Sequence, residues 1–150
     1  MKTSESINLF LTQPTIAVVG VSRQKNKFGN TVYTTLKKRG LHLVPVNPHL
    51  TEFDGDKCFS NIETLPSEIK ALFINTPPEK TSGIVEAAIK KGITHFWLQQ
   101  GSSNAEIVRK LQSSDVNVIS ERCILMFAEP VGSFHRIHKF LSKITGNYPA

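Results

Sequence analysis

The sequence predicts a doubly wound α/β domain, built on a mainly parallel five-stranded sheet with helices on both faces. Two observations predict it. Short apolar runs alternate along the chain with segments whose apolar residues recur at helical spacing, which is typical of parallel strands joined by right-handed crossovers. The first of these runs, Ile16–Val19, is apolar without interruption, as expected of a strand that is buried on both faces of a parallel sheet.

The chain is expected to begin with a helix, a strand and a second helix. Residues 4–11 carry apolar side chains at helical spacing and form a short helix that packs on the first strand, Ile16–Val19. A polar loop follows Gly20. Residues 28–39 then carry an apolar residue at every fourth position, which indicates a helix, and Gly40 ends it as a left-handed residue.

The second strand is predicted over residues 41–48. It contains Pro45, which has no amide hydrogen to donate to a ladder, so we expect this strand at an edge of the sheet or the proline near the strand's end. The chain that follows is predicted to be irregular. It holds a turn at Asp54-Gly55 and a helical turn near residues 62–65.

The second half of the chain repeats the alternation of strands and helices. Three further strands are predicted, at residues 71–75, 94–101 and 116–120. We expect Thr76 to cap the helix after the third strand, with Pro77 at its first position. Ser103 and Glu106 are expected to form a capping box at the next helix. A last helix is predicted over about residues 131–145.

Size and composition favour one globular domain over residues 1–150. Its two cysteines are too few for a disulfide framework, and the N-terminus lacks the apolar core of a signal peptide. No apolar run approaches the ~20 residues of a membrane span. We therefore expect a cytoplasmic protein that does not bind to membranes.

The formal charge of +6 is concentrated in the first third of the chain. Residues 6–51 contain no Asp or Glu. The basic residues of this stretch are Arg23, Lys25, Lys27, Lys37, Lys38 and Arg39. The last three lie in a final helical turn, where cations stabilise the helix dipole, so the first three are the ligand candidates. Nucleic acid is not expected as a partner, because no recognition motif and no aromatic residues accompany the basic ones.

The segment from the first strand to the second helix predicts a site for a phosphorylated small molecule. Gly20 has no side chain to keep a phosphate away from the backbone, and the free amides at the start of the following helix carry a partial positive charge. The alternative is that Gly20 only turns the chain, and a strand-glycine-helix unit alone leaves both open.

Two features argue against NAD as the ligand. After Gly20 the next glycine is Gly29, so the closely spaced glycines of a dinucleotide fingerprint are missing. The second strand ends in Asn47-Pro48-His49, where a dinucleotide site needs a carboxylate for the ribose hydroxyls. A ligand with more phosphate is favoured by the cationic loop, and NADP stays open on this argument.

The chain resembles the CoA-binding protein family, which has the Rossmann-like fold of the N-terminal domain of the succinyl-CoA synthetase alpha subunit. The matching pieces occur in the same order, from about residue 14 to residue 123. They are IAVVGVS at the first strand, VPVNP at the second, FWLQQG at the fourth and ERCI after the fifth. The resemblance implies a pocket for coenzyme A or an acyl-CoA.

The resemblance also implies which residues form that pocket. The phosphates would lie against the first loop and helix start, the adenosine beside the turn after the second strand, and the pantetheine arm beside the turn after the third. The implied binding residues are Gly20, Val21, Ser22, Arg23, Lys27, Phe28, Asn47, Pro48, Asn75, Thr76 and Pro77. Related synthetases place a lysine just beyond the second turn, where this chain has His49 and Leu50, so His49 is not included.

No catalytic or metal-binding residues are predicted. Cys123 fits a small buried apolar group better than a redox thiol, and Trp97 fits the core better than an adenine-stacking site. His135 and His138 lie three apart, but no carboxylate or cysteine is placed to complete a metal site with them.

We therefore expect a domain that holds CoA or an acyl-CoA and is not catalytic by itself. Related synthetases carry their phosphorylated histidine in a second domain, so the resemblance supports binding and not ligation. One alternative is a CoA-dependent ligase subunit that needs a partner. Another is an NAD(P)-binding regulatory module. A protein partner and a homo-oligomer both stay open.

Overall fold

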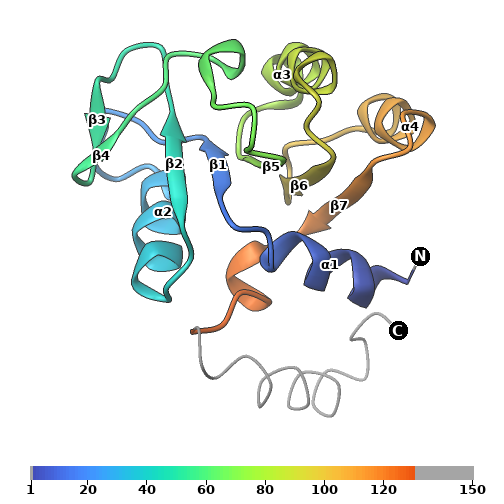
Figure 1. The fold of residues 1–150 in the computed structure, drawn as a ribbon, viewed down its shortest axis with the longest axis horizontal. Helices are drawn as coiled ribbons and strands as arrows, with labels where there is room; N and C mark the ends of the chain where they lie inside the picture. Colours follow the sequence, from blue (N-terminus) through green and yellow to red (C-terminus); the bar gives the residue numbers. More distant parts are fainter. Residues whose placement is uncertain (1, 131–150) are drawn as a thin grey trace.

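The computed structural model describes residues 2–130 (Figure 1). The helices of this part are α1 (Thr3–Leu11), α2 (Phe28–Lys38), α3 (Pro78–Lys91) and α4 (Ala105–Ser113), with the short 3₁₀ helices η1 (Ile62–Thr64) and η2 (Ile124–Met126). The strands are β1 (Ile16–Val19), β2 (Leu43–Val46), β3 (Glu52–Phe53), β4 (Asp56–Lys57), β5 (Ala71–Ile74), β6 (His95–Gln99) and β7 (Asn117–Arg122). The last predicted helix lies outside the described residues.

The main sheet confirms the predicted fold class. In the described part of the chain it has five strands in the order β2-β1-β5-β6-β7, and every neighbouring pair is parallel. The strand order reverses beside β1, because the chain first runs to β2 on one side and later to β5 on the other. In such sheets ligands bind beyond the carboxyl ends of the strands at this point.

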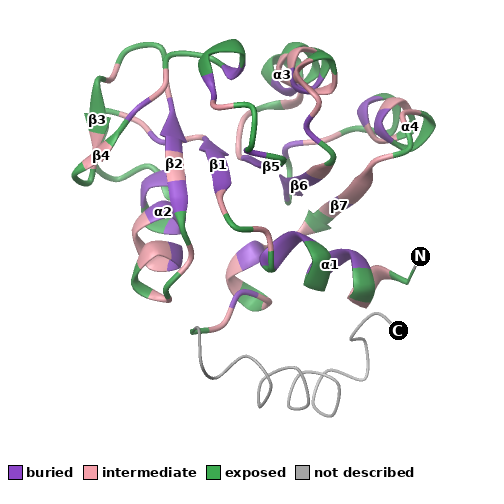
Figure 2. Ribbon diagram, viewed as in Figure 1, coloured by how far each residue is buried: buried purple, intermediate pink, exposed green. Residues whose placement is uncertain are grey.

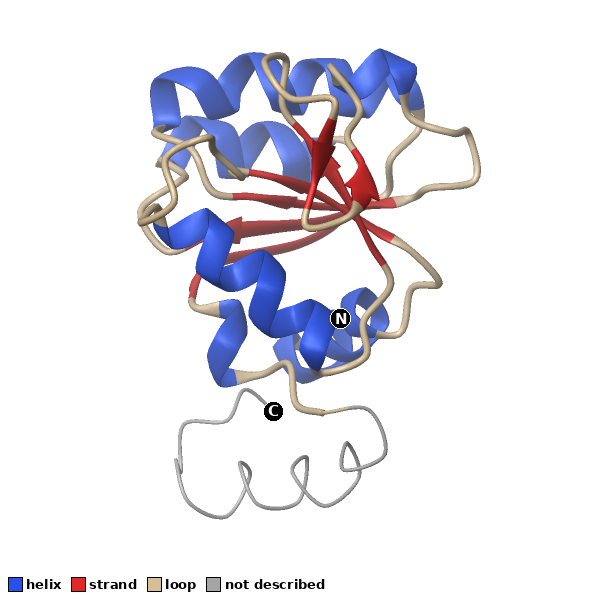
Figure 3. Cartoon of the chain, turned by 90° about the vertical axis from the view of Figure 1, so that its left-hand side faces the viewer, coloured by secondary structure: helices blue, strands red, loops and turns tan. Residues whose placement is uncertain are grey.

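Alternation of side chains along each strand explains why the apolar runs are unbroken. Ile16 and Val18 lie in the core on one face of the sheet, and Ala17 and Val19 lie in the core on the other. Figure 3 shows helices on both sides of the sheet, and Figure 2 shows the strands at the centre as buried. Helices α1 and α2 cover the first face, and α3 and α4 cover the second. Trp97 is fully buried in the first core, as expected.

The edge position predicted for the proline strand is also confirmed. β2 lies at one end of the strand order, so β1 is its one neighbour within the sheet. Pro45 pairs there with Val18 of β1. On the outer side, the amide of Phe59 donates to the Pro45 carbonyl (2.9 Å) and the Asn47 amide donates to the Phe59 carbonyl (2.9 Å). The segment that leads into η1 is therefore fixed along the outer edge of β2.

A small hairpin that the sequence did not predict lies next to α2. Strands β3 and β4 pair around the Asp54-Gly55 turn. The Tyr33 hydroxyl of α2 donates to the Asp56 carboxylate (2.6 Å), and the Lys37 ammonium lies 3.1 Å from it. The hydrogen bond from Tyr33 lowers the pKa of Asp56, and burial raises the pKa of Tyr33. These contacts hold the hairpin against the helix.

The two predicted helix caps are each wrong by one residue. Helix α3 begins at Pro78, with Pro77 as its N-cap. A residue before proline is disfavoured in the helical conformation, so Pro77 is extended and the helix cannot begin there. The Thr76 hydroxyl instead shares a hydrogen bond with the Thr81 hydroxyl (2.8 Å). At α4 the cap is Asn104, whose side chain accepts from the Ile107 amide (2.9 Å).

Candidate functional site

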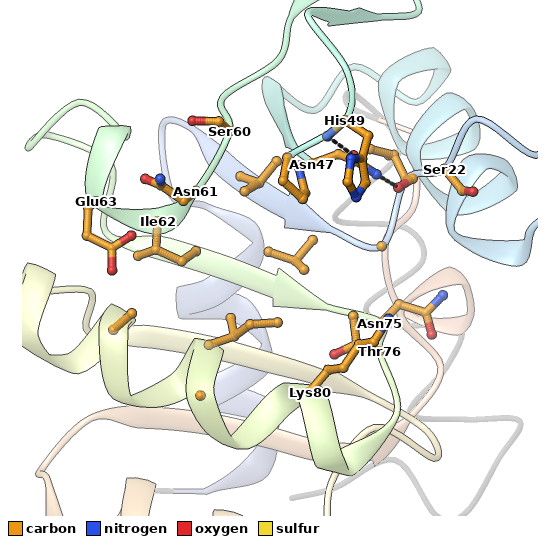
Figure 4. Close-up of a pocket in the computed structure, with 18 of the residues that line it drawn as sticks. Ser22, Asn47, His49, Ser60, Asn61, Ile62, Glu63, Asn75, Thr76 and Lys80 are labelled. Carbon is orange, nitrogen blue, oxygen red and sulfur yellow. Dashed lines mark hydrogen bonds between the residues drawn. The ribbon is translucent and has the colours of Figure 1, made fainter.

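A cavity of about 670 Å³ opens at the carboxyl ends of β1, β2 and β5, where the strand order reverses (Figure 4). Its walls include eight of the eleven residues singled out in the sequence: Gly20, Val21, Ser22, Lys27, Asn47, Pro48, Asn75 and Thr76. Arg23 and Phe28 do not line it, and Pro77 lines a neighbouring cavity instead. His49, which the sequence analysis left out, does line it.

Two glycines make the close approach between β1 and α2. A side-chain carbon at Gly29 would lie 2.0 Å from the carbonyl oxygen of Gly20, so only glycine fits there. Gly20 has φ of +136°, and a side-chain carbon on it would lie 2.9 Å from the Asn75 backbone oxygen. The start of α2 therefore lies directly against the end of β1, and the end of β1 against the turn after β5.

Asn30 fixes the loop between Gly20 and α2. Its side-chain oxygen accepts from the Ser22 amide (2.7 Å), and its side-chain nitrogen donates to the carbonyls of Ser22 (2.9 Å) and Gln24 (3.0 Å). The Ser22 hydroxyl oxygen accepts from the Gln24 amide (3.1 Å). The Ser22 amide is thus occupied, which leaves its hydroxyl hydrogen as the donor that this residue can offer to a ligand.

Asn47 fixes the same loop from the side of β2. Its side-chain nitrogen donates to the Val21 carbonyl (2.7 Å), and its side-chain oxygen accepts from the His49 amide (2.7 Å). Figure 4 shows Asn47 between His49 and the segment that carries Ser22. The side-chain amide of Asn47 therefore holds both the loop after β1 and the turn after β2 in place.

The start of α2 is electrostatically suited to an anion. Its N-cap residue, Lys27, makes no side-chain capping hydrogen bond, and its first turn contains no acidic residue. The backbone amides of Phe28 and Gly29 have no carbonyl acceptor one turn earlier in the helix, so they are free to donate to a ligand. Lys27 lines the cavity, and no carboxylate in the first turn of this helix neutralises its charge or the positive end of the helix dipole.

The wall opposite this loop was not predicted from the sequence. Ser60, Asn61, Ile62 and Glu63 line the cavity from the segment at η1, and Figure 4 shows them at the end away from Ser22. The helical turn predicted near residues 62–65 is present as η1, but its place at the site depends on contacts that are distant in the sequence, the pairing of Phe59 with β2 and the packing of η1 on α3. The residues that α3 contributes are Lys80, Gly83, Ile84 and Ala87. Their spacing of three and four places them on one helix face, which is a signal that the sequence did contain.

Metal ligands and reactive thiols are the next groups to locate around the cavity. Residues 2–130 hold no group of three or more His, Cys, Asp or Glu side chains that could bind a metal ion. Cys58 lies close to the site, its sulfur 3.7 Å from the Asn47 carbonyl oxygen, and burial raises the pKa of its thiol, which makes it less reactive. Within the same range, no helix is long and apolar enough to span a membrane.

The comparison with known families decides what kind of domain this is. The family model for the CoA binding domain matches residues 14–129. The chain belongs to the CoA-binding domain family. The protein YneT of Bacillus subtilis is 29% identical over 109 residues, which cover 73% of this chain and 81% of YneT. The solved structure of a hypothetical protein from Pyrococcus horikoshii has 31% identity and a TM-score of 0.75, covering 82% of this chain and 87% of that one.

This CoA-binding domain is also similar to part of a much larger enzyme. The ADP-forming acetate–CoA ligase II of Archaeoglobus fulgidus is 27% identical over 104 residues. The match covers 64% of this chain but 16% of the ligase. The similarity therefore concerns one portion of that enzyme.

Proposed function

We propose that this domain binds coenzyme A or an acyl-CoA in the 670 Å³ cavity, with the diphosphate at the start of α2, and that it is not catalytic by itself. The observation that carries the proposal is the uncapped, acid-free start of α2 beside Gly20. Anions are stabilised at such helix ends by free amides and the helix dipole. Membership of the CoA-binding domain family makes CoA the expected anion.

The residues that line the cavity suit the two halves of CoA on either side of this diphosphate. Toward η1 the walls are apolar at Val46, Ile62 and Ile84 and polar at Asn61 and Glu63, which fits the faces and the amino edge of an adenine ring. In the other direction lies the turn after β5. The pantetheine arm would pass along it. Lys27 and Lys80 supply positive charge near the phosphates.

A non-catalytic role is supported by how the reactive groups of the wall are arranged. Its titratable side chains, Lys27, His49, Glu63 and Lys80, come from separate segments. An activated nucleophile needs a base within hydrogen-bond reach. The hydroxyls of Ser22 and Thr76 interact with the Gln24 amide and the Thr81 hydroxyl, and neither has such a base.

Calorimetric titration with CoA, dephospho-CoA, NAD and NADP tests the proposal. We expect CoA to bind most tightly and NAD to give no measurable heat. Lys27→Gln should weaken CoA binding by about three- to tenfold, because it removes one charge at the phosphates. Lys38→Gln is the matched control, since Lys38 is exposed, lies at the other end of α2 and is outside the cavity wall. Binding of NAD or NADP in preference to CoA would support the regulatory-module alternative and refute the proposal.

Similarity to the ADP-forming ligase favours a second candidate, a subunit that presents CoA to a catalytic partner. The chain alone, supplied with acetate, ATP and CoA, should then form no acetyl-CoA. Acetyl-CoA should form only when a larger protein that co-purifies with the chain is added. Turnover by the isolated chain would contradict the non-catalytic role.

A further inference from the structure

A second cavity of about 390 Å³ adjoins the first, at the carboxyl ends of β5 and β6. The two cavities share Asn75 and Thr76. The remaining walls of the second cavity are Pro77, Pro78, Glu79, Gln100, Gly101 and Ser102. A ligand that occupies the first cavity and continues past the turn after β5 therefore enters the second.

The second cavity differs from the first in its electrostatics. It lies at the start of α3, where the N-cap and the first helical residue are Pro77 and Pro78. Neither proline has an amide hydrogen, so two of the donors that a helix start usually offers to an anion are missing. The next residue, Glu79, carries a carboxylate into the first turn. This cavity therefore disfavours the phosphate or carboxylate that the start of α2 attracts.

One wall residue of the second cavity indicates that a ligand group with a hydrogen-bond acceptor fits there. Ser102 is 2% exposed, and its amide donates to the Gln99 carbonyl (2.8 Å). Its hydroxyl has no hydrogen-bond partner within residues 2–130. Within residues 2–130 the Asn117 side-chain oxygen is the one buried side-chain polar atom without a partner, so the Ser102 hydroxyl is open to the cavity that it lines. There it can donate to a carbonyl oxygen of a ligand.

We propose that the second cavity holds an uncharged acyl group carried on the CoA thiol. In this arrangement the Ser102 hydroxyl is available to the acyl carbonyl, and Glu79 selects against acyl groups that end in a carboxylate. The inference rests on the proposed function, because CoA has to occupy the first cavity for its thioester to reach the second.

Butyryl-CoA and succinyl-CoA form the matched test pair, since both carry four-carbon acyl groups and only the second ends in a carboxylate. Calorimetric titration at low salt should give at least fivefold tighter binding of butyryl-CoA. Glu79→Gln should bring the two affinities within about twofold by improving succinyl-CoA binding. Glu68→Gln, an exposed position outside both cavities, should leave the ratio unchanged.

A second variant tests the hydroxyl separately. Ser102→Ala should weaken butyryl-CoA by about threefold and leave free CoA unaffected, since free CoA has no acyl carbonyl. Equal affinity of the wild type for the two acyl-CoAs, or a ratio that Glu79→Gln does not move, overturns the acyl site while CoA binding itself stands. Failure of CoA to bind at all overturns the proposed function and this inference together.

Discussion

Replacing Gly29 by alanine tests the contact on which the site is built. Gly29 is the second residue of α2, and helices favour alanine over glycine by up to about 1 kcal/mol, so helix propensity alone predicts a more stable protein. In this structure the added carbon would lie 2.0 Å from the Gly20 carbonyl oxygen and 2.6 Å from its carbonyl carbon. Both are backbone atoms and cannot rotate away. The end of β1 and the start of α2 must therefore move apart.

The size of the effect follows from that distance. Ordinary contact begins at 3.4 Å, so a displacement of about 1.4 Å is needed. Overpacking of this kind costs about 1–3 kcal/mol, which outweighs the gain in helix propensity. We expect Gly29→Ala to lower the free energy of unfolding by about 1–2 kcal/mol in urea denaturation. CoA affinity should fall at least tenfold in calorimetry, because the loop at the phosphates moves with the helix.

Gly83→Ala is the matched control. Gly83 also lies inside a helix, but a side-chain carbon there would meet no atom within 4 Å. It should raise the free energy of unfolding by up to about 1 kcal/mol, opposite in sign to Gly29→Ala. If Gly29→Ala proved as stable as Gly83→Ala, the close approach of β1 and α2 would be wrong.

Three further predictions concern the loop, the hairpin and the first sheet face. Asn30→Ala removes three hydrogen bonds to the loop. It should lower the free energy of unfolding by about 2 kcal/mol in urea denaturation and CoA affinity by about tenfold in calorimetry. Unchanged CoA affinity would show that Asn30 does not hold the loop in place for binding. Tyr33→Phe removes the bond that lowers the pKa of Asp56, a bond that stabilises the fold above the unfolded pKa of about 3.8 and is lost as the pH falls through the folded value. An NMR titration should therefore find the Asp56 pKa higher in the variant, and an identical value would refute the contact. Burial lowers the pKa of His95, whose ring nitrogen lies 3.2 Å from the Asn117 side-chain nitrogen, so stability should fall as the pH drops below about 6.5. His95→Gln, which keeps an acceptor for Asn117, should reduce that fall in urea denaturation at pH 7.5 and 5.5, and an equally steep fall would show that another group is responsible.

The fold was predictable because its signals are local and repeated. The run Ile16–Val19 is apolar throughout since it faces two cores, and Pro45 is tolerated because β2 ends the sheet order. Capping was not predictable to the residue. Whether Thr76 or Pro77 is the N-cap of α3 depends on the conformational restriction that Pro78 places on the residue before it.

The candidate site was predictable only where it lies next to a strand end. Gly20, Asn47 and Asn75 follow β1, β2 and β5 directly, so their position at one rim follows from parallel pairing. Asn30 gave no signal, because it looks like an ordinary polar residue in the first turn of a helix. Glu63 reaches the cavity through the pairing of residues near Phe59 with β2, a contact with no mark in the local sequence.

The bracing of the loop by Asn30 and Asn47 bears on the kinetics of binding. A loop held in place from two sides before a ligand arrives has little conformational freedom left to lose. Association should then proceed without a slow rearrangement step. Differences in affinity among CoA derivatives should appear mainly in how fast each one leaves.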